Sequence, residues 1–353
     1  MNSGIQDARY KMNHVSCIVN PASILEAKAI GYKALKSLSS SKKTARVHSV
    51  FDRGFYIQFG KNHLINVIKN ASYMAPSSIL IELPDNVSFN SIGIKEGMRV
   101  KIDKKSMTIG HEALEIKFSK SSAWSPSTPP NRDDLISAVK ISLNLRILRD
   151  IIYTCPSREG LVLLLENVEL YGPTQLFLKP QKPSFSETAR PYIETLMWGL
   201  FGGNLNTIVG MVSQILGLGP GLTPSCDDFL TGLILSLNVG GKLLSRRKKN
   251  ELGFYRKISS EICRAAKEKT TIYSQNSLNG ARNEEGPKAV VELVFCLLTK
   301  DPNEVGAVSK TVINMGETSG ADIAIGVYYG IRFLLSRLEL SELEVTENLY
   351  GIS

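Results

Sequence analysis

Residues 216–232 read LGLGPGLTPSCDDFLTG, a glycine-rich turn between two apolar segments of helical periodicity. Glycines lack the Cβ that keeps a backbone away from a bound group. Thr223 suits the N-cap of the second helix and Pro224 its first position, so the N–H groups of a helix start face the turn. We therefore predict that a phosphate or carboxylate binds the backbone from Gly219 through Gly221 to Thr223.

The same device recurs at residues 316–326, GETSGADIAIG. With one gap at Pro224, both stretches contain Gly-x-Thr-Ser-x-x-Asp-x-x-x-Gly, and in each the aspartate and the last glycine share a helix face. The glycine leaves room beside the carboxylate for another helix or a ligand. If the two helix starts face one another, their polar groups form one site. The predicted catalytic residues are Asp227, Asp228 and Asp322, and the predicted substrate-binding residues are Gly219, Gly221, Thr223, Ser225, Thr318, Ser319 and Gly320.

Asp228 and Asp322 suit three roles: a general base, an acceptor that orients an amide NH2, or a ligand of Mg²⁺. We favour hydrogen bonding, because sequence specifies Mg²⁺ sites poorly, and Mg²⁺ is the one cofactor that we name as a candidate. The structural alternative is that both motifs only cap and pack two helices. Cys226 is either activated by the helix start or packed in the core, and packing is the simpler interpretation. Polar residues 269–283 can add a cation or an amide to the site, but a plain loop is simpler.

Short apolar runs punctuated by turns precede residue 124 and predict a small antiparallel β-barrel or sandwich. The expected order is a helical lead-in, 24–38, and then strands at 45–51, 54–59, 64–68, 78–83, 99–103, 107–109 and 114–118. Paired prolines end this pattern, and helical periodicity follows. Helices are expected at 133–152, 158–166, 187–200, 205–216, 224–237, 251–267, 287–298, 305–314 and 319–338.

The predicted fold class is therefore α+β, with a β-rich domain at 1–123, a proline-rich linker at 124–132 and a mostly α-helical domain at 133–353. A basic run, residues 246–249, follows a predicted helix stop at Gly240 and Gly241, and we expect a solvated loop there.

The chain of 353 residues is 43% hydrophobic and 21% charged, which is typical of a globular protein. Neither a run of about 18 apolar residues nor a secretory signal is evident, so we expect a cytoplasmic protein without a membrane span. The five cysteines are scattered without a CxxC pair, which excludes a disulfide framework and a cysteine zinc site.

Residues 1–130 carry 18 Lys and Arg against 9 Asp and Glu, so the net charge of +9 arises in the β-rich part. The lysines are dispersed and no RNP-like motif accompanies them, which favours a solubilising or subunit-facing surface over nucleic-acid binding. All four histidines lie at or before His111. A site built wholly from later residues would act without imidazole.

The two motifs, together with HSVFDRGFYIQFG at 48–60 and the tryptophan-proline linker, resemble the AllH family, a subunit linked to oxamate carbamoyltransferase in anaerobic allantoin breakdown. The resemblance implies an enzyme of several dissimilar subunits that interconverts oxalurate plus phosphate with oxamate plus carbamoyl phosphate. It therefore implies a small anionic substrate and partner subunits. The family usually has Thr-Pro-Ser-Gly-Asp-Asp, and here Cys226 replaces the glycine.

Two hypotheses follow. The first is a carbamoyltransferase or a subunit of one, since positioning and stabilisation of a developing anion need no histidine. The alternative is a non-catalytic subunit that binds a metabolite and uses its basic β-rich domain to dock partners. A third hypothesis, that the barrel binds nucleic acid, is supported only by the positive charge of the β-rich domain.

Overall fold

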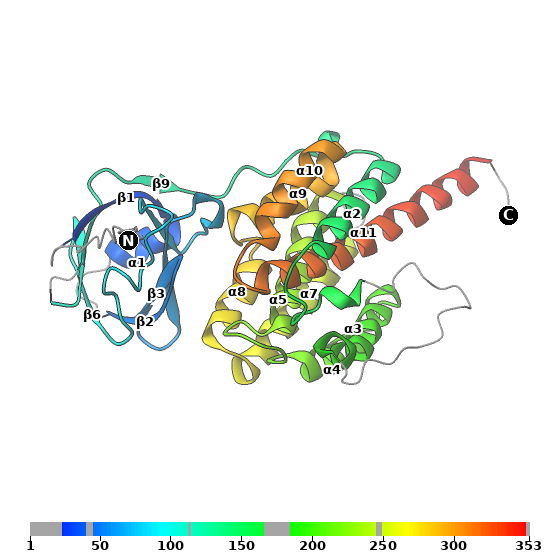
Figure 1. Ribbon diagram of the computed structural model, residues 1–353. Helices are drawn as coiled ribbons and strands as arrows, with labels where there is room; N and C mark the ends of the chain where they lie inside the picture. Colours follow the sequence, from blue (N-terminus) through cyan, green and yellow to red (C-terminus); the bar gives the residue numbers. More distant parts are fainter. Residues whose placement is uncertain (1–22, 40–44, 112–113, 166–183, 245–248, 351–353) are drawn as a thin grey trace, which may run out of the picture.

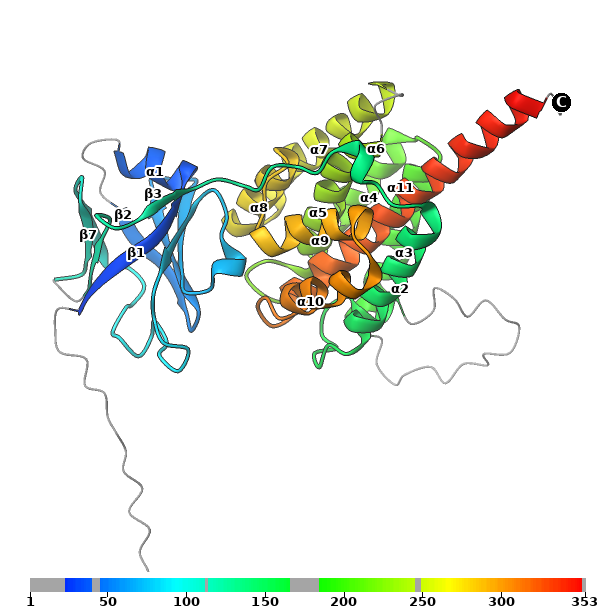
Figure 2. The ribbon, with the colours of Figure 1, turned by 90° about the horizontal axis from the view of Figure 1, so that it is seen from above.

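The computed structural model describes residues 23–39, 45–111, 114–165, 184–244 and 249–350. Figure 1 shows a β-barrel beside a larger helical region, so the predicted α+β class is confirmed. In Figure 2 an extended segment leaves the barrel and crosses the helical region before the first long helix begins.

The described residues of the barrel form nine strands in one sheet. The order β5-β4-β3-β2-β6-β7-β8-β1 is closed by pairing of β1 with β5, and β9 pairs with β1 beyond the end of β8. Because the ring of strands is closed, the domain is a barrel and not a sandwich, the other predicted alternative. Most pairs are antiparallel, whereas β1 with β8, β1 with β9 and β4 with β5 are parallel. The strands are β1 Ser23–Gly31, β2 Ala45–Phe51, β3 Gly54–Phe59, β4 His63–Ile68, β5 Ser78–Ile81, β6 Arg99–Ile102, β7 Ser106–Ile109, β8 Leu114–Lys117 and β9 Ser122–Trp124.

All seven predicted strands are confirmed, but the helical lead-in at 24–38 is wrong in its first half. That half is strand β1, and only α1, Tyr32–Ser39, is helical. Tertiary pairing decides the outcome, because β1 closes the barrel by pairing on both edges. Gly31 allows a close approach there, since a Cβ on it would lie 2.3 Å from the Pro76 carbonyl oxygen.

The described residues after the linker form ten α-helices around a central, wholly buried α5. Apolar residues from the surrounding helices make one continuous core with it. The helices are α2 Ala138–Tyr153, α3 Phe185–Phe201, α4 Leu205–Ile215, α5 Ser225–Leu235, α6 Gly241–Leu244, α7 Lys249–Lys269, α8 Ile272–Arg282, α9 Lys288–Thr299, α10 Pro302–Ile313 and α11 Ser319–Tyr350.

Three predictions in this region are wrong. Residues 158–166 do not form an α-helix in their described part, which holds only a short 3-10 turn, Val162–Leu164. The polar segment 269–283 is not a loop, because α8 occupies most of it.

The helix stop at Gly240 and Gly241 is also wrong. The chain passes from α5 through a π-helical turn, Ser236–Gly240, directly into α6. Both glycines serve close packing, since a Cβ on Gly240 would lie 2.8 Å from Leu334 and one on Gly241 would lie 2.8 Å from Tyr255. Of the basic run, residues 246–248 lie outside the described residues, and Lys249 begins α7.

The starts of α5 and α11 are brought together by reciprocal glycine contacts. A Cβ on Gly232 would lie 2.1 Å from the Ile323 carbonyl oxygen, and one on Gly326 would lie 2.0 Å from the Phe229 carbonyl oxygen. Each glycine follows its motif aspartate by four residues, and each carbonyl follows the other aspartate by one. The contacts advance together along both segments, from Thr223 with Ser319 at the starts to Ser236 with Gly330 and Gly240 with Leu334 further on. The two helices therefore run parallel and in register, and the room beside each carboxylate is filled by the partner helix.

Replacing Gly232 or Gly326 by Ala should destabilise the fold by about 1–3 kcal/mol or more, because the new methyl group has no space against the facing backbone. The matched control is Gly210→Ala in α4, where a Cβ would meet nothing within 4 Å. It should gain about 1 kcal/mol from helix propensity. Urea unfolding of the three variants measures this, and equal stabilities would contradict the close contact.

Candidate functional site

The paired motifs meet where α5 and α11 begin. The Thr223 hydroxyl donates to Asp228 Oδ2 at 2.9 Å and lies 2.9 Å from the Ser319 hydroxyl. Ser319 is also close enough to Asp228 to lower the pKa of that carboxyl group. Asp228 is thus held by the threonine of its own motif and by the serine of the other.

Asp322 has the mirror-image surroundings. The Ser225 and Thr318 hydroxyls lie near its carboxylate and act to lower its pKa. The Leu161 N–H donates to Asp322 Oδ1 at 2.7 Å. In contrast, Asp322 Oδ2 and Ser225 Oγ are buried and have no well-aligned hydrogen-bond partner among the described residues. The Asp322 carboxylate and the Ser225 hydroxyl therefore lie close together at a buried position without an aligned hydrogen bond between them.

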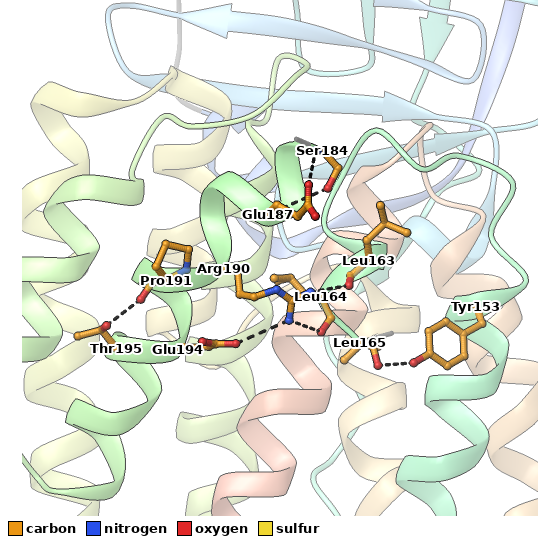
Figure 3. Close-up of polar contacts among 10 residues, drawn as sticks. All are labelled: Tyr153, Leu163, Leu164, Leu165, Ser184, Glu187, Arg190, Pro191, Glu194 and Thr195. Atoms are coloured by element: carbon orange, nitrogen blue, oxygen red, sulfur yellow. Dashed lines mark hydrogen bonds and ion pairs between the residues drawn. The ribbon is translucent and has the colours of Figure 1, made fainter. Parts of the chain in front are cut away.

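The segment that carries the Leu161 amide is fixed by α2 and α3 (Figure 3). The Arg190 guanidinium donates to the Leu163 carbonyl at 2.8 Å and to the Leu164 carbonyl at 3.2 Å. Tyr153 donates to the Leu165 carbonyl, and a capping box of Ser184 and Glu187 begins α3. Because this segment turns instead of continuing as an α-helix, the Leu161 N–H is available to Asp322.

Gly160 brings the same segment against the carboxylate. A Cβ on Gly160 would lie 2.4 Å from Asp322 Oδ1, so only glycine allows this approach. The Ser186 hydroxyl donates to the Gly160 carbonyl at 2.8 Å and holds it there. The sequence predicted a helix at 158–166 and did not indicate that Gly160 and Leu161 contact Asp322.

Burial controls the charge of the two carboxyl groups. Burial raises the pKa of Asp322 to about 6, against the hydrogen bonds that favour its ionised form. Burial, followed by the negative charges of Asp322 and Asp227, raises the pKa of Asp228 well above its ordinary value. A carboxyl group with a pKa of about 6, such as Asp322, can accept and return a proton near neutral pH.

Asp227 faces different partners. The Gly217 N–H donates to its Oδ1 at 2.9 Å, and the Thr270 hydroxyl donates to its Oδ2. The Thr271 hydroxyl donates to the Leu222 carbonyl at 2.7 Å. Asp227 and the start of α8 therefore fasten the glycine-rich turn. The ammonium group of Lys269 is engaged with the Ser213 carbonyl at 2.6 Å.

The glycine-rich turn itself wraps the start of α5. The helix begins at Ser225 with Pro224 as N-cap residue, so the expected N-cap Thr223 lies one residue outside and bonds across to the other motif instead. Gly219 has φ +118°, and a Cβ on it would lie 2.6 Å from the Ser225 nitrogen. Gly221 has φ +91° and is exposed, with only the Thr223 carbonyl near a would-be Cβ, at 3.6 Å. Open backbone is therefore found at Gly221 and not at Gly219.

Two further predicted positions have clear packing roles. Gly320 lies against α10, since a Cβ on it would be 2.0 Å from the Val312 carbonyl oxygen. Cys226 is fully buried in the helical core. Burial, reinforced by the charges of Asp227 and Asp322, raises the pKa of its thiol, which therefore stays protonated. These contacts favour packing over reactivity for Cys226.

The barrel also contributes side chains next to the paired motifs. The Tyr273 hydroxyl lies 2.5 Å from His48 Nδ1 and donates to Ser49 at 2.7 Å. The Tyr56 ring packs 5.0 Å from the Tyr273 ring, and burial, Tyr273 and Asp228 together raise the pKa of Tyr56 to about 12. All three barrel residues belong to the segment 48–60. The sequence of this segment carries part of the family resemblance but did not indicate that any of its residues belongs to the site.

The described residues contain no group of three or more His, Cys, Asp and Glu side chains arranged to hold a metal ion. No helix formed by them is long and apolar enough to cross a membrane. A cavity of about 580 Å³ lies between the linker and α6, α7 and α9, and its lining shares no residue with the paired motifs.

The protein combines a closed β-barrel with a helical region in which two helix starts are joined by hydrogen bonds. These two features define its architectural class. Two family models match the chain: the AllH family N-terminal domain over residues 26–123, and oxamate carbamoyltransferase subunit AllH over residues 215–331. Together they cover more than half of the chain, including the barrel and both motifs. The chain belongs to the AllH family. No solved structure matches it.

The raised pKa of Asp322 predicts a pH dependence of stability. The folded protein holds the proton more tightly than the unfolded chain, so this group's contribution is full below about pH 4 and falls as pH rises towards 6. A pKa raised from 3.8 to about 6 corresponds to about 3 kcal/mol. Asp322→Asn should remove that decline, so its stability relative to the parent should increase between pH 4 and pH 7.

Urea unfolding at several pH values measures the difference between the variant and the parent. Asp85→Asn, at an exposed turn, is the control and should follow the parent at every pH. A constant difference between Asp322→Asn and the parent across this range would show that Asp322 is not a buried carboxyl group.

Proposed function

We propose that this chain is a subunit of a carbamoyltransferase and binds a small anionic amide, oxamate or oxalurate, between the starts of α5 and α11. The observation that carries the proposal is the buried pair Asp228 and Asp322, each flanked by a Thr hydroxyl of its own motif and a Ser hydroxyl of the other, with no aligned hydrogen bond at Asp322 Oδ2. Membership of the AllH family supports the reaction class. The proposed setting is purine or allantoin nitrogen metabolism.

The proposed chemistry is proton transfer together with positioning. When the oxamate nitrogen attacks carbamoyl phosphate, a C–N bond forms, the carbonyl C–O bond to phosphate breaks, and the nitrogen loses a proton. The leaving phosphate takes up one proton. A carboxylate can accept the first proton and supply the second, and Asp322 Oδ2, which has no aligned hydrogen bond, is our candidate for this role. Asp228 is the candidate for orienting the amide NH2.

The anionic part of the substrate requires a separate place, since two carboxyl groups repel it. The open backbone from Gly221 to Thr223 is the proposed oxyanion site. The parallel alignment of α5 and α11 supports it, because two helix N-terminal ends with the same polarity add their favourable potentials for an anion. Ser225, Thr318 and Ser319 would supply further hydroxyl donors.

Mg²⁺ is the cofactor candidate. Asp228 already accepts a hydroxyl hydrogen bond from Thr223, and Asp322 accepts one from the Leu161 amide, which favours hydrogen bonding to substrate over metal ligation. If Mg²⁺ binds, Asp228 and Asp322 would be its protein ligands. Its chemistry would be neutralisation of phosphate charge.

A non-catalytic, metabolite-binding subunit is the second candidate. It is favoured by the complete burial of Asp322 and by the near-complete burial of Asp228. In that case the basic barrel would dock the partner subunits. Turnover by the assembled complex distinguishes the two roles, because a scaffold subunit tolerates loss of both carboxylates.

Asp228→Asn and Asp322→Asn should lower turnover by about 100-fold or more while leaving the fold intact. A merely capping carboxylate contributes only about 0.3–1 kcal/mol to stability and nothing to rate. Turnover and melting temperature are measured for the complex containing each variant. The control is Asp301→Asn, because Asp301 occupies the N-cap of α10 without forming a side-chain cap bond. Near-parent activity of both site variants would make these aspartates structural.

Gly221→Val should abolish stabilisation by phosphate and carbamoyl phosphate, because its side chain would cover the proposed oxyanion site. Valine is strained at φ +91°, so a control for strain alone is needed. Gly203→Val provides it, since Gly203 has φ +65° and open surroundings in the turn between α3 and α4. Both variants should melt earlier, but only Gly221→Val should lose the ligand-induced thermal shift. Retention of that shift would disprove the oxyanion site.

A further inference from the structure

We propose that Tyr56, on barrel strand β3, is a substrate-binding residue of the α5–α11 site and donates a hydrogen bond to the carbonyl oxygen of a carbamoyl or oxamyl group. The proposal rests on the proposed function and deepens it, because it places one side of the substrate site on the barrel. It concerns a primary amide as the chemical class that is recognised.

The Tyr56 hydroxyl is a hydrogen-bond donor that the described part of the chain leaves unused. Its side chain is half-buried, and none of the hydrogen bonds among the described residues involves its hydroxyl. The ring is held from two sides, 5.0 Å from the Tyr273 ring and 6.2 Å from the Phe51 ring, both edge to face. Aromatic packing therefore fixes the ring and leaves its polar tip available.

The hairpin of β2 and β3 is anchored over both helix starts. On the α8 side, Tyr273 bonds to His48 and Ser49 of β2, and α8 is tied through Thr271 to the glycine-rich turn. On the α11 side, Arg53 at the hairpin tip donates to the Asn314 carbonyl at 3.3 Å, five residues before α11 begins.

A second barrel residue strengthens the contact on the α11 side. The Tyr73 hydroxyl donates to the same Asn314 carbonyl at 3.1 Å. Tyr56 therefore sits on a hairpin that cannot move away from the paired motifs without breaking contacts at both ends.

Charge and hydrogen-bonding polarity fit an amide at this place. The Asp228 carboxyl group is near enough to contribute to the raised pKa of Tyr56, so the phenol stays protonated and remains a donor at neutral pH. A primary amide presents a carbonyl acceptor beside NH2 donors. Tyr56 supplies the donor for the carbonyl, and the motif carboxylates supply acceptors for the NH2 group. Inorganic phosphate has no such pairing of groups.

The test is binding of oxamate, carbamoyl phosphate and inorganic phosphate to the full-length parent and to Tyr56→Phe by isothermal titration calorimetry. Removing one hydrogen bond should weaken oxamate and carbamoyl phosphate by about tenfold, with phosphate unchanged. The melting temperature without ligand should match that of the parent, since the hydroxyl has no hydrogen-bond partner among the residues that the structure describes. Tyr73→Phe is the control, because it removes a barrel hydroxyl that bridges to the helical region at Asn314.

The outcomes separate the two proposals. If the parent binds no ligand, the proposed function fails and this inference fails with it. If the parent binds but Tyr56→Phe binds all three ligands equally well, Tyr56 is not a substrate contact and only this inference fails. An equal loss for Tyr56→Phe and Tyr73→Phe, or an equal loss for phosphate, would assign the effect to docking of the barrel and overturn the carbonyl contact.

Discussion

The close contact between α5 and α11 is the constraint on which the rest of the structure depends. It requires glycine at residues 232 and 326, because the facing carbonyl oxygens occupy the space of a side chain. Backbones in such contact keep two helix starts level, so that the hydroxyls of one motif reach the carboxylate of the other. A helix pair with ordinary spacing of 8–10 Å between axes would leave each motif to cap itself.

This arrangement buries two carboxyl groups side by side, which is unfavourable unless each is paired. The hydroxyls, the Leu161 amide and the two helix ends offset part of the free energy needed to bury the ionised carboxyl groups. The part that is not offset raises the pKa values of Asp228 and Asp322. Packing alone would be served as well by apolar residues. The retention of polar groups at this position is the physical reason to interpret the pair as a functional site.

The sequence predicted those features whose causes are local. Alternating apolar residues between turns identified seven strands, and the repeated motif identified both helix starts. The predictions were wrong where contacts between residues far apart in the chain determine the secondary structure. The pattern of strand β1 predicts a helix until its three strand partners are known. In α8, polar residues in the sequence obscure a buried face that includes Tyr273, Leu278 and Ala281. Nothing in the local pattern of 48–60 indicates that this hairpin meets a helix start more than 150 residues later.

The structure of the protein with bound oxamate or carbamoyl phosphate, at concentrations that saturate the thermal shift, tests the central claim most directly. The account predicts ligand density at the start of α5 and α11, in contact with the Thr223 and Ser319 hydroxyls. Density elsewhere, for example in the cavity beneath the linker, with the paired motifs unchanged, would contradict the account.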